Sequence, residues 1–245
     1  AMAVFGAATL ALVLWRVPET APALNPAALR LGPLFSGYVQ IGRHPGFLSW
    51  TLLNSTGYAA NFGFFSSSSY LYIETFGVSK TLFGLAIGGA SVTYLVGTFL
   101  CRRWIAREGI VRCVRRSGGL SLLAAAVFIV PQLLQAHTAQ SLTLGLWLTL
   151  LAYGIAQPCG HVGIASAFPA RAGAASALGG FMLAAAAFLC GTWMGLMFHS
   201  GSAAVLSLTT GILVACSGLA ALTLVQRHGH PAVLPILPAT HRGST

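Results

Sequence analysis

Residues 97–116 read Gly97-Thr-Phe-Leu-Cys-Arg-Arg-Trp-Ile-Ala-Arg-Glu-Gly-Ile-Val-Arg-Cys-Val-Arg-Arg116. This arginine segment holds six of the 13 lysine and arginine residues in a chain of 245 residues. In a soluble protein, such a basic cluster would indicate binding to nucleic acid or to an acidic partner. Long apolar stretches flank the segment on both sides. The role of the basic cluster therefore depends on whether these stretches lie in a soluble core or in lipid.

The composition indicates that the surroundings are mostly lipid. Hydrophobic residues make up 56% of the chain, charged residues only 7%, and the mean hydropathy is +0.80. An ordinary soluble domain has about 25% charged residues. The charges of this chain are too few to cover a water-soluble surface, and its apolar residues exceed what one core can bury. The sequence therefore predicts a membrane protein in contact with the lipid bilayer.

Six apolar stretches are each long enough to cross a bilayer as a helix, which takes about 20 residues. We therefore expect an all-α membrane protein whose residues 47–226 form six transmembrane helices. The expected spans are 47–71, 81–101, 117–136, 141–166, 172–198 and 203–226.

The regions outside these spans have a different character. Residues 1–15 are apolar but too short to cross, and we interpret them as the end of a transmembrane helix whose beginning is missing. A signal peptide is the alternative, although no basic region precedes the run.

Residues 16–46 carry prolines and arginines and are predicted to be an aqueous connector. Within it, residues 31–38 fit either a short amphipathic surface helix or a plain loop. Residues 227–245 are expected to form a disordered tail.

The basic residues predict the orientation of the spans. Twelve of the 13 fall in links on one side of the membrane, and Lys80 alone falls on the other. By the positive-inside rule, the side with twelve is cytoplasmic, so the connector, the arginine segment and the tail face the cytoplasm. A basic link between membrane helices belongs to no nucleic-acid-binding domain, and we expect no nucleic-acid partner.

The sequence offers no catalytic or metal-binding constellation, so we expect neither an enzyme nor a bound cofactor. The three acids, Glu19, Glu74 and Glu108, all lie in links or loops. The five cysteines show no paired spacing and are predicted to form neither a disulfide framework nor a metal site. The two histidines of the tail, His228 and His230, are interpreted as incidental.

The first span carries a polar and aromatic stripe at helical spacing. Because a solute crosses the membrane only if its lost hydration is replaced, such a stripe predicts the wall of a substrate cavity. The mixture of amide and aromatic groups suits an amphipathic or aromatic drug-like molecule. The alternative is that its two asparagines form hydrogen bonds between helices. The stripe consists of Trp50, Asn54, Tyr58, Asn61 and Phe65.

The fourth span adds Tyr153, Gln157 and His161, again at spacings of four. His161 is the ionisable group that we place inside a span, near its cytoplasmic end, and such a group is a functional candidate. A hydrated histidine without such a role is the alternative. Pro158 and the neighbouring glycines indicate either a bend used during transport or close helix packing.

Four motifs resemble, in order, segments of drug:proton antiporters of the major facilitator superfamily (MFS). Arg16-Val-Pro-Glu-Thr20 is similar to the end of their sixth helix, and Arg43-His-Pro-Gly-Phe-Leu48 to the start of their seventh. Phe76-Gly-Val-Ser-Lys-Thr-Leu-Phe-Gly84 resembles the link into the eighth helix. Pro169-Ala-Arg-Ala-Gly-Ala-Ala-Ser-Ala-Leu-Gly179 resembles the start of the eleventh and is most specific for the bicyclomycin/chloramphenicol-resistance (Bcr/CflA) branch.

This resemblance implies the carboxyl-terminal six-helix half of a transporter in the bacterial inner membrane, with an amino-terminal half missing. The activity implied is proton-driven drug efflux by alternating access, with the proton gradient as the energy source and no cofactor. No Asp or Glu lies in a span, so the resemblance places the proton-carrying carboxylate in the missing half. An importer of metabolites on the same fold, or a non-transporting receptor or scaffold, are the alternatives.

The arginine segment resembles the loop motif of the superfamily, Gly-x-x-x-Asp-Arg-x-Gly-Arg-Arg. The resemblance implies a gating role, but Cys101 stands where an acidic or amide residue is expected, and the arginines could instead serve only to fix the topology. The gating candidates, including those of the motif at 169–179, are Gly97, Arg103, Arg107, Gly109, Arg171 and Gly173.

The substitution Ile110→Cys tests the predicted orientation. Because the arginine segment is expected in the cytoplasm, a membrane-impermeant maleimide should label the new cysteine in inside-out vesicles and not in intact cells. The unsubstituted chain, with its five native cysteines, is the control. Labelling of intact cells above this control would reverse the topology.

Overall fold

The computed structural model describes residues 2–16, 31–198 and 202–230, and the chain divides into two units, residues 1–37 and 38–245. The first unit contains helix α1 (Met2–Arg16) and the beginning of helix α2 (Leu31–Gly42). α1 has 15 residues, so the apolar run expected here is helical. Its described side chains are exposed. It is shorter than the roughly 20 residues that cross a bilayer.

Helix α2 resolves one alternative left open by the sequence. The stretch at 31–38 is helical and not a plain loop, and the helix continues to Gly42. Ile41, near its end, is buried in the core of the second unit. Residues 17–30 of the expected connector and residues 231–245 of the expected tail lie outside the described residues.

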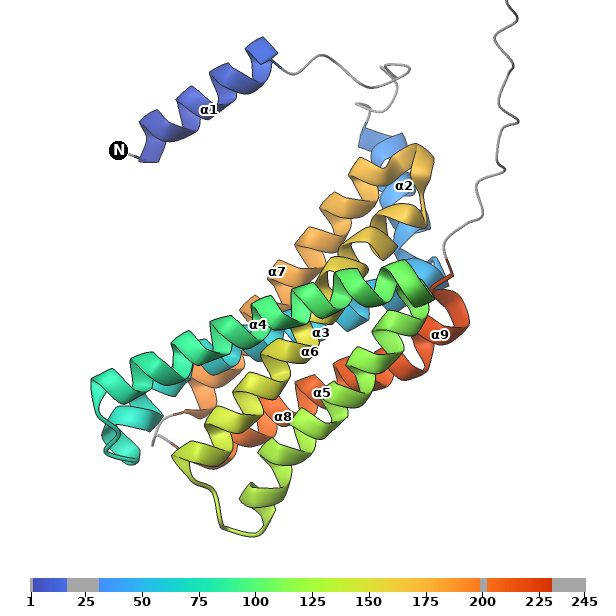
Figure 1. The fold of residues 1–245 in the computed structure, drawn as a ribbon. Coiled ribbons are helices and arrows are strands. Elements are labelled where there is room, and N and C mark those ends of the chain that lie inside the picture. The colour runs from blue at the N-terminus through green and yellow to red at the C-terminus, as the bar shows by residue number, and fades with distance from the viewer. Residues whose placement is uncertain (1, 17–30, 199–201, 231–245) are drawn as a thin grey trace, which may run out of the picture. The chain divides into compact units, whose positions relative to one another are not determined.

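In the described part of the second unit, six long helices form a bundle joined by short links (Figure 1). A π-helical turn η2 (Leu71–Thr75), a 3-10 turn η3 (Pro169–Arg171) and a short helix α9 (Leu224–His228) extend three of them. No strand occurs among the described residues, so the predicted all-α class is confirmed. The long helices are α3 (Pro45–Tyr70), α4 (Lys80–Glu108), α5 (Ile110–Leu133), α6 (Ala139–Ser166), α7 (Ala172–Met197) and α8 (Ala203–Leu222).

The arginine segment is not the loop that we expected. Helix α4 continues through its first three arginines to Glu108, and α5 begins at Ile110. Arg, Leu, Ala and Glu are good helix formers, so only Gly109, with φ of 79°, interrupts the helix. An ion pair of 2.5 Å between Arg116 Nη2 and Glu108 Oε1 bridges the turn.

Among the described residues, five helices are long and apolar enough to cross a membrane by length and composition. They are α4, α5, α6, α7, and α8 together with α9. The expected span 47–71 corresponds to α3, which is long enough but is not among the five. Its polar residues account for this, because Asn54, Asn61 and several serines lower the hydropathy of the helix.

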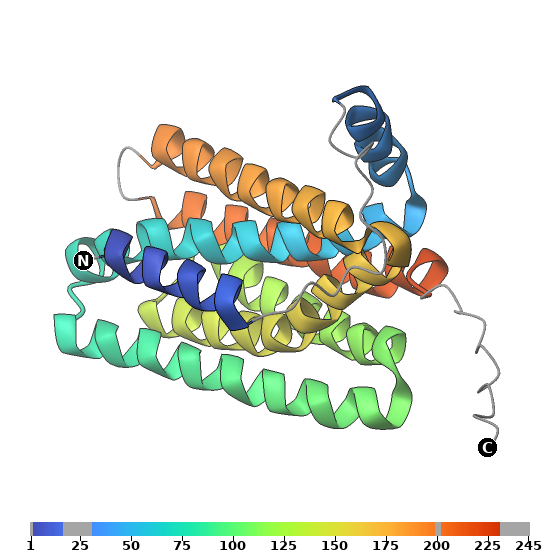
Figure 2. The same cartoon turned by 90° about the horizontal axis from the view of Figure 1, so that it is seen from above.

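Helix α3 lies at the centre of the bundle. It packs against α6, α7 and α8, while α4 packs mainly on α6, and α5 packs on α6 and α8. Figure 2 shows α3 between α7 on one side and α4, α5 and α6 on the other. Large apolar side chains such as Leu85, Phe99, Phe181 and Phe188 are exposed on the outer helices. These surfaces indicate contact with the lipid bilayer.

The backbones of α4 and α6 approach closely at a pair of glycines. A Cβ atom on Gly97 would collide with the carbonyl oxygen of Leu151 and lie 3.2 Å from Cα of Gly154. A Cβ atom on Gly154 would in turn collide with the carbonyl oxygen of Tyr94. Small residues at such crossings let membrane helices approach closely, because they remove the side chains that would separate them.

The substitution Gly97→Ala should therefore destabilise the bundle. The added methyl group meets rigid backbone, and overpacking of this kind costs about 1–3 kcal/mol of unfolding free energy. Gly88→Ala on the same helix is the matched control, because nothing lies within 4 Å of its Cβ position. Thermal unfolding in detergent micelles measures both variants. Equal midpoints for the two would contradict the close α4–α6 contact.

Candidate functional site

A pocket of about 510 Å³ lies between α3, α4 and α6. Three helices contribute to its wall, and none of the described residues that line it is charged. Five of the eight residues predicted for the cavity line this pocket, namely Tyr58, Asn61, Phe65, Tyr153 and Gln157. The other lining residues are Phe62, Ser66, Tyr94 and Leu150.

Two buried polar atoms of the lining residues have no hydrogen-bond partner among the described residues. Asn61 donates from Nδ2 to the carbonyl oxygen of Gly57 at 2.8 Å, but its Oδ1 is buried and unpaired. The hydroxyl of Tyr153 is also buried and unpaired. Because buried polar atoms are nearly always hydrogen-bonded, these two require solvent or a ligand as partner. One offers an acceptor, and the other can donate or accept.

The aromatic side chains on α3 are open to this space. Tyr58 is 38% exposed, and Phe62 and Phe65 are each 43% exposed. Exposed aromatic faces beside unpaired polar atoms are the features of a small-molecule site. The geometry can therefore hold an uncharged or amphipathic molecule by stacking and by a few hydrogen bonds.

Tyr94 is a lining residue that sequence analysis missed. Its hydroxyl donates a hydrogen bond to Oε1 of Gln157, which fixes the carboxamide at the edge of the pocket and joins α4 to α6. Its ring also lies 6.3 Å from that of Tyr153, centroid to centroid. A tyrosine in the middle of an otherwise apolar span was a signal that could have identified it.

Trp50 and Asn54 lie outside the pocket, in the packing between α3 and α6. Trp50 is 2% exposed and its indole fills the space over Gly163. Asn54 is fully buried, and its carboxamide lies against Gly160. No described hydrogen bond joins Asn54 or Asn61 to another helix, so the alternative of hydrogen bonds between helices has no support there.

His161 is exposed and does not line the pocket. It lies on α6 one turn beyond Gln157, close to the end of the helix at Ser166. Pro158 is within the continuous helix α6. The glycines near it pack closely, because Gly160 and Gly163 receive Asn54 and Trp50.

The gating candidates are dispersed. Gly97 lies at the α4–α6 contact, and Gly109 forms the turn between α4 and α5. Arg103 and Arg107 are exposed, and neither makes an ion pair with a described residue. Arg171 donates to Oε1 of Gln40 at 3.1 Å and so ties η3 to α2. Gly173 has open space at its Cβ position.

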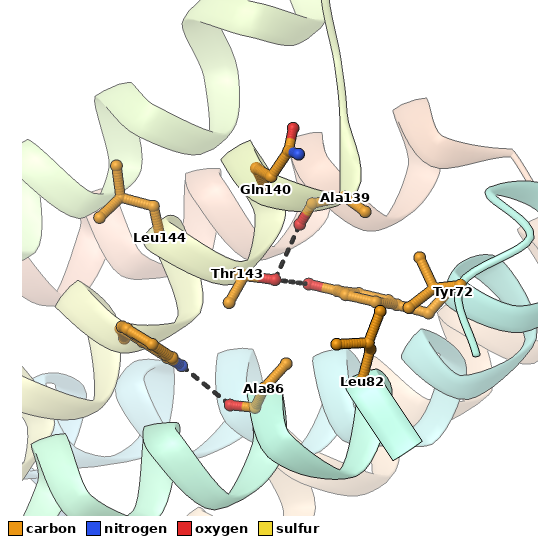
Figure 3. A pocket seen from close by; sticks show the side chains of 9 residues that line it. Tyr72, Leu82, Ala86, Ala139, Gln140, Thr143 and Leu144 are labelled. Carbon is orange, nitrogen blue, oxygen red and sulfur yellow. Dashed lines mark hydrogen bonds between the residues drawn. The ribbon is translucent and has the colours of Figure 1, made fainter. Parts of the chain in front are cut away.

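A second pocket, of about 430 Å³, lies where η2 meets the first turns of α4 and α6 (Figure 3). The hydroxyls of Tyr72 and Thr143 are 2.9 Å apart, and Thr143 donates onward to the carbonyl oxygen of Ala139 at 2.8 Å. Trp147 donates to the carbonyl oxygen of Ala86, also at 2.8 Å. These polar groups are satisfied within the protein, so this pocket lacks the unpaired atoms of the first.

Burial raises the pKa of Tyr72 to about 12, with the hydrogen bond to Thr143 opposing the shift. The hydroxyl is therefore protonated at neutral pH. Because Thr143 donates its own proton to Ala139, Tyr72 is the donor in their shared hydrogen bond. The hydrogen bond between Tyr72 and Thr143 therefore joins η2 to α6.

The chain is similar to a protein of Haemophilus influenzae (strain ATCC 51907 / DSM 11121 / KW20 / Rd) named "Bicyclomycin resistance protein homolog". The two share 27% identity over 232 residues, which cover 91% of this chain and 56% of the relative. The chain thus spans about half the length of the curated relative that it matches. No protein-family model matches the chain. No solved structure matches it either.

Proposed function

We propose that this chain is the carboxyl-terminal half of a secondary transporter that exports drug-like molecules from the bacterial cytoplasm. The transporter would be an MFS drug:proton antiporter of the Bcr/CflA type. The observation that carries the proposal is the pocket between α3, α4 and α6, with its buried unpaired Asn61 Oδ1 and Tyr153 hydroxyl. The name of the Haemophilus influenzae relative, which refers to bicyclomycin resistance, supports a drug as the class of substrate.

The chemistry of the pocket suits such a substrate. Its volume of about 510 Å³ falls within the roughly 300–1,000 Å³ typical of small-molecule sites. Exposed aromatic rings supply apolar contact, and the amide and hydroxyl groups replace part of the hydration that a drug loses in the membrane. Because no lining residue is charged, the pocket discriminates against strongly charged solutes.

The exposed side of the pocket is the surface that we assign to the missing half. In transporters built from two repeats, substrates bind near the midplane between the halves, and alternating access results from rocking of one half against the other. In this proposal, Tyr58 and Phe65 face the second half across the substrate.

Proton coupling would depend on groups outside this bundle. Glu74 lies in η2 and Glu108 is the last residue of α4, so neither is in the middle of a span. No described residue near the pocket is an acid. We therefore assign the proton-carrying carboxylate to the missing half.

Drug susceptibility of an efflux-deficient bacterial host tests the proposal directly. Expression of the full-length gene should raise the inhibitory concentration of at least one amphipathic or aromatic drug several-fold over the empty vector. A protonophore should remove the difference in drug accumulation. Increased accumulation of a compound would instead indicate import, and no effect on any compound would contradict export.

Within this assay, Asn61→Ala should weaken export of some substrates at unchanged expression. Loss of one hydrogen bond to an uncharged group costs about 0.5–1.5 kcal/mol, which is roughly a 2- to 10-fold loss of affinity. Tyr153→Phe removes only a hydroxyl and provides a second variant with the ring retained. Ser69→Ala is the matched control, because Ser69 is exposed on α3 outside the pocket. Unchanged resistance to every exported substrate in both pocket variants would exclude this pocket.

A further inference from the structure

Three cysteines from three different helices meet in the bundle. Cys101 lies on α4, Cys113 on α5 and Cys159 on α6. Their three Sγ atoms all lie within 4.8 Å of one another, and those of Cys101 and Cys159 are 3.6 Å apart. All three are free thiols. Sequence spacing gave no indication of this cluster, because only the packing of α4, α5 and α6 brings the thiols together.

The cluster is enclosed in an apolar core. The three residues are between 0% and 2% exposed, and Val114, Ile155 and Trp104 belong to the core around them. Among the described residues, no histidine, aspartate or glutamate joins the group. The side-chain ligands that the described residues offer here are therefore three sulfurs.

This geometry matches a three-coordinate metal site. Three sulfurs at about 2.3 Å from a central ion in one plane would be about 4 Å from one another. The observed spacing, from 3.6 Å to at most 4.8 Å, brackets that value. Zinc prefers four ligands in a tetrahedron, whereas soft thiolate ligands select Cu(I), so a three-sulfur set favours the softer ion.

The position of Cys113 near a helix N-terminus favours the thiolate form that a metal requires. Cys113 lies in the first turns of α5, where the helix N-terminus stabilises negative charge.

We propose that Cys101, Cys113 and Cys159 form a binding site for one soft, thiophilic metal ion such as Cu(I). Binding forms three sulfur–metal bonds and releases three S–H protons to solvent, without oxidation of sulfur or metal. The ion joins α4, α5 and α6 next to the Gly109 turn. This proposal is independent of the transported substrate, because none of the three cysteines lines the pocket.

Anaerobic titration of the full-length reduced protein in detergent tests the site, with Cu(I) as the probe and a coloured Cu(I) chelator as competitor. The Cys190→Ala/Cys216→Ala variant is the matched control, because those two cysteines lie outside the cluster. This control variant should bind one Cu(I) ion tightly per protein molecule, at the cluster. Cu(I) should also raise the thermal unfolding midpoint of the variant.

Adding Cys113→Ala to that variant should weaken the tight binding by more than about 100-fold, which exceeds the effect of removing an outer-shell partner. Size-exclusion chromatography establishes that the triple variant folds. X-ray absorption of the control variant gives an independent readout that needs no cluster mutation, with three sulfurs expected at about 2.3 Å. The proposal would be overturned if the control variant bound no Cu(I) tightly, or if tight binding persisted without Cys113. A coordination shell of nitrogen or oxygen would also overturn it.

Discussion

Close contact between helix backbones at small residues is the constraint on which this bundle depends. Lipid offers helices no hydrophobic gain from associating, so they are held by packing that requires close approach. Helix α6 shows both kinds of close contact. Its Gly154 lies against the backbone of α4, and its Gly160 and Gly163 lie against side chains of α3. On the other side of the bundle, Gly118 of α5 faces Gly218 of α8, where each Cβ position lies 3.0 Å from the other's carbonyl oxygen.

The central position of α3 explains why one helix is both polar and structurally essential. Because α3 packs against α6, α7 and α8, many more of its residues are buried in protein than those of α4. A polar composition is tolerable in that place, and it is what excludes α3 from the helices apolar enough to span a membrane. Near Trp50 its side chains fill gaps over glycines, and from Tyr58 to Phe65 they line an open pocket.

Sequence periodicity predicted helices and grouped several residues that line the pocket, but it could not predict how the helices pack. The spacing of Asn54, Tyr58 and Asn61 places them on one face of a helix, but it does not show which neighbour covers each turn of that face. Asn54 proved to be covered by α6, and Asn61 to line the pocket. The cluster of three cysteines depends on contacts between distant segments, which no local pattern records. The charge of the arginine segment predicts a link in water, but the helix propensity of its residues continues α4 to Glu108.

The pocket and the cysteine cluster share one structural dependence. On α4, Tyr94 lies about one turn before Gly97, and Cys101 lies about one turn after it. Tyr94 reaches Gln157 on α6, and Cys101 reaches Cys159 on the same helix. The Gly97–Gly154 contact sets the separation of α4 and α6 within about one helical turn of these two links. A displacement of α4 relative to α6 therefore changes the wall of the pocket and the spacing of the sulfurs together, because packed helices move as rigid elements and not residue by residue.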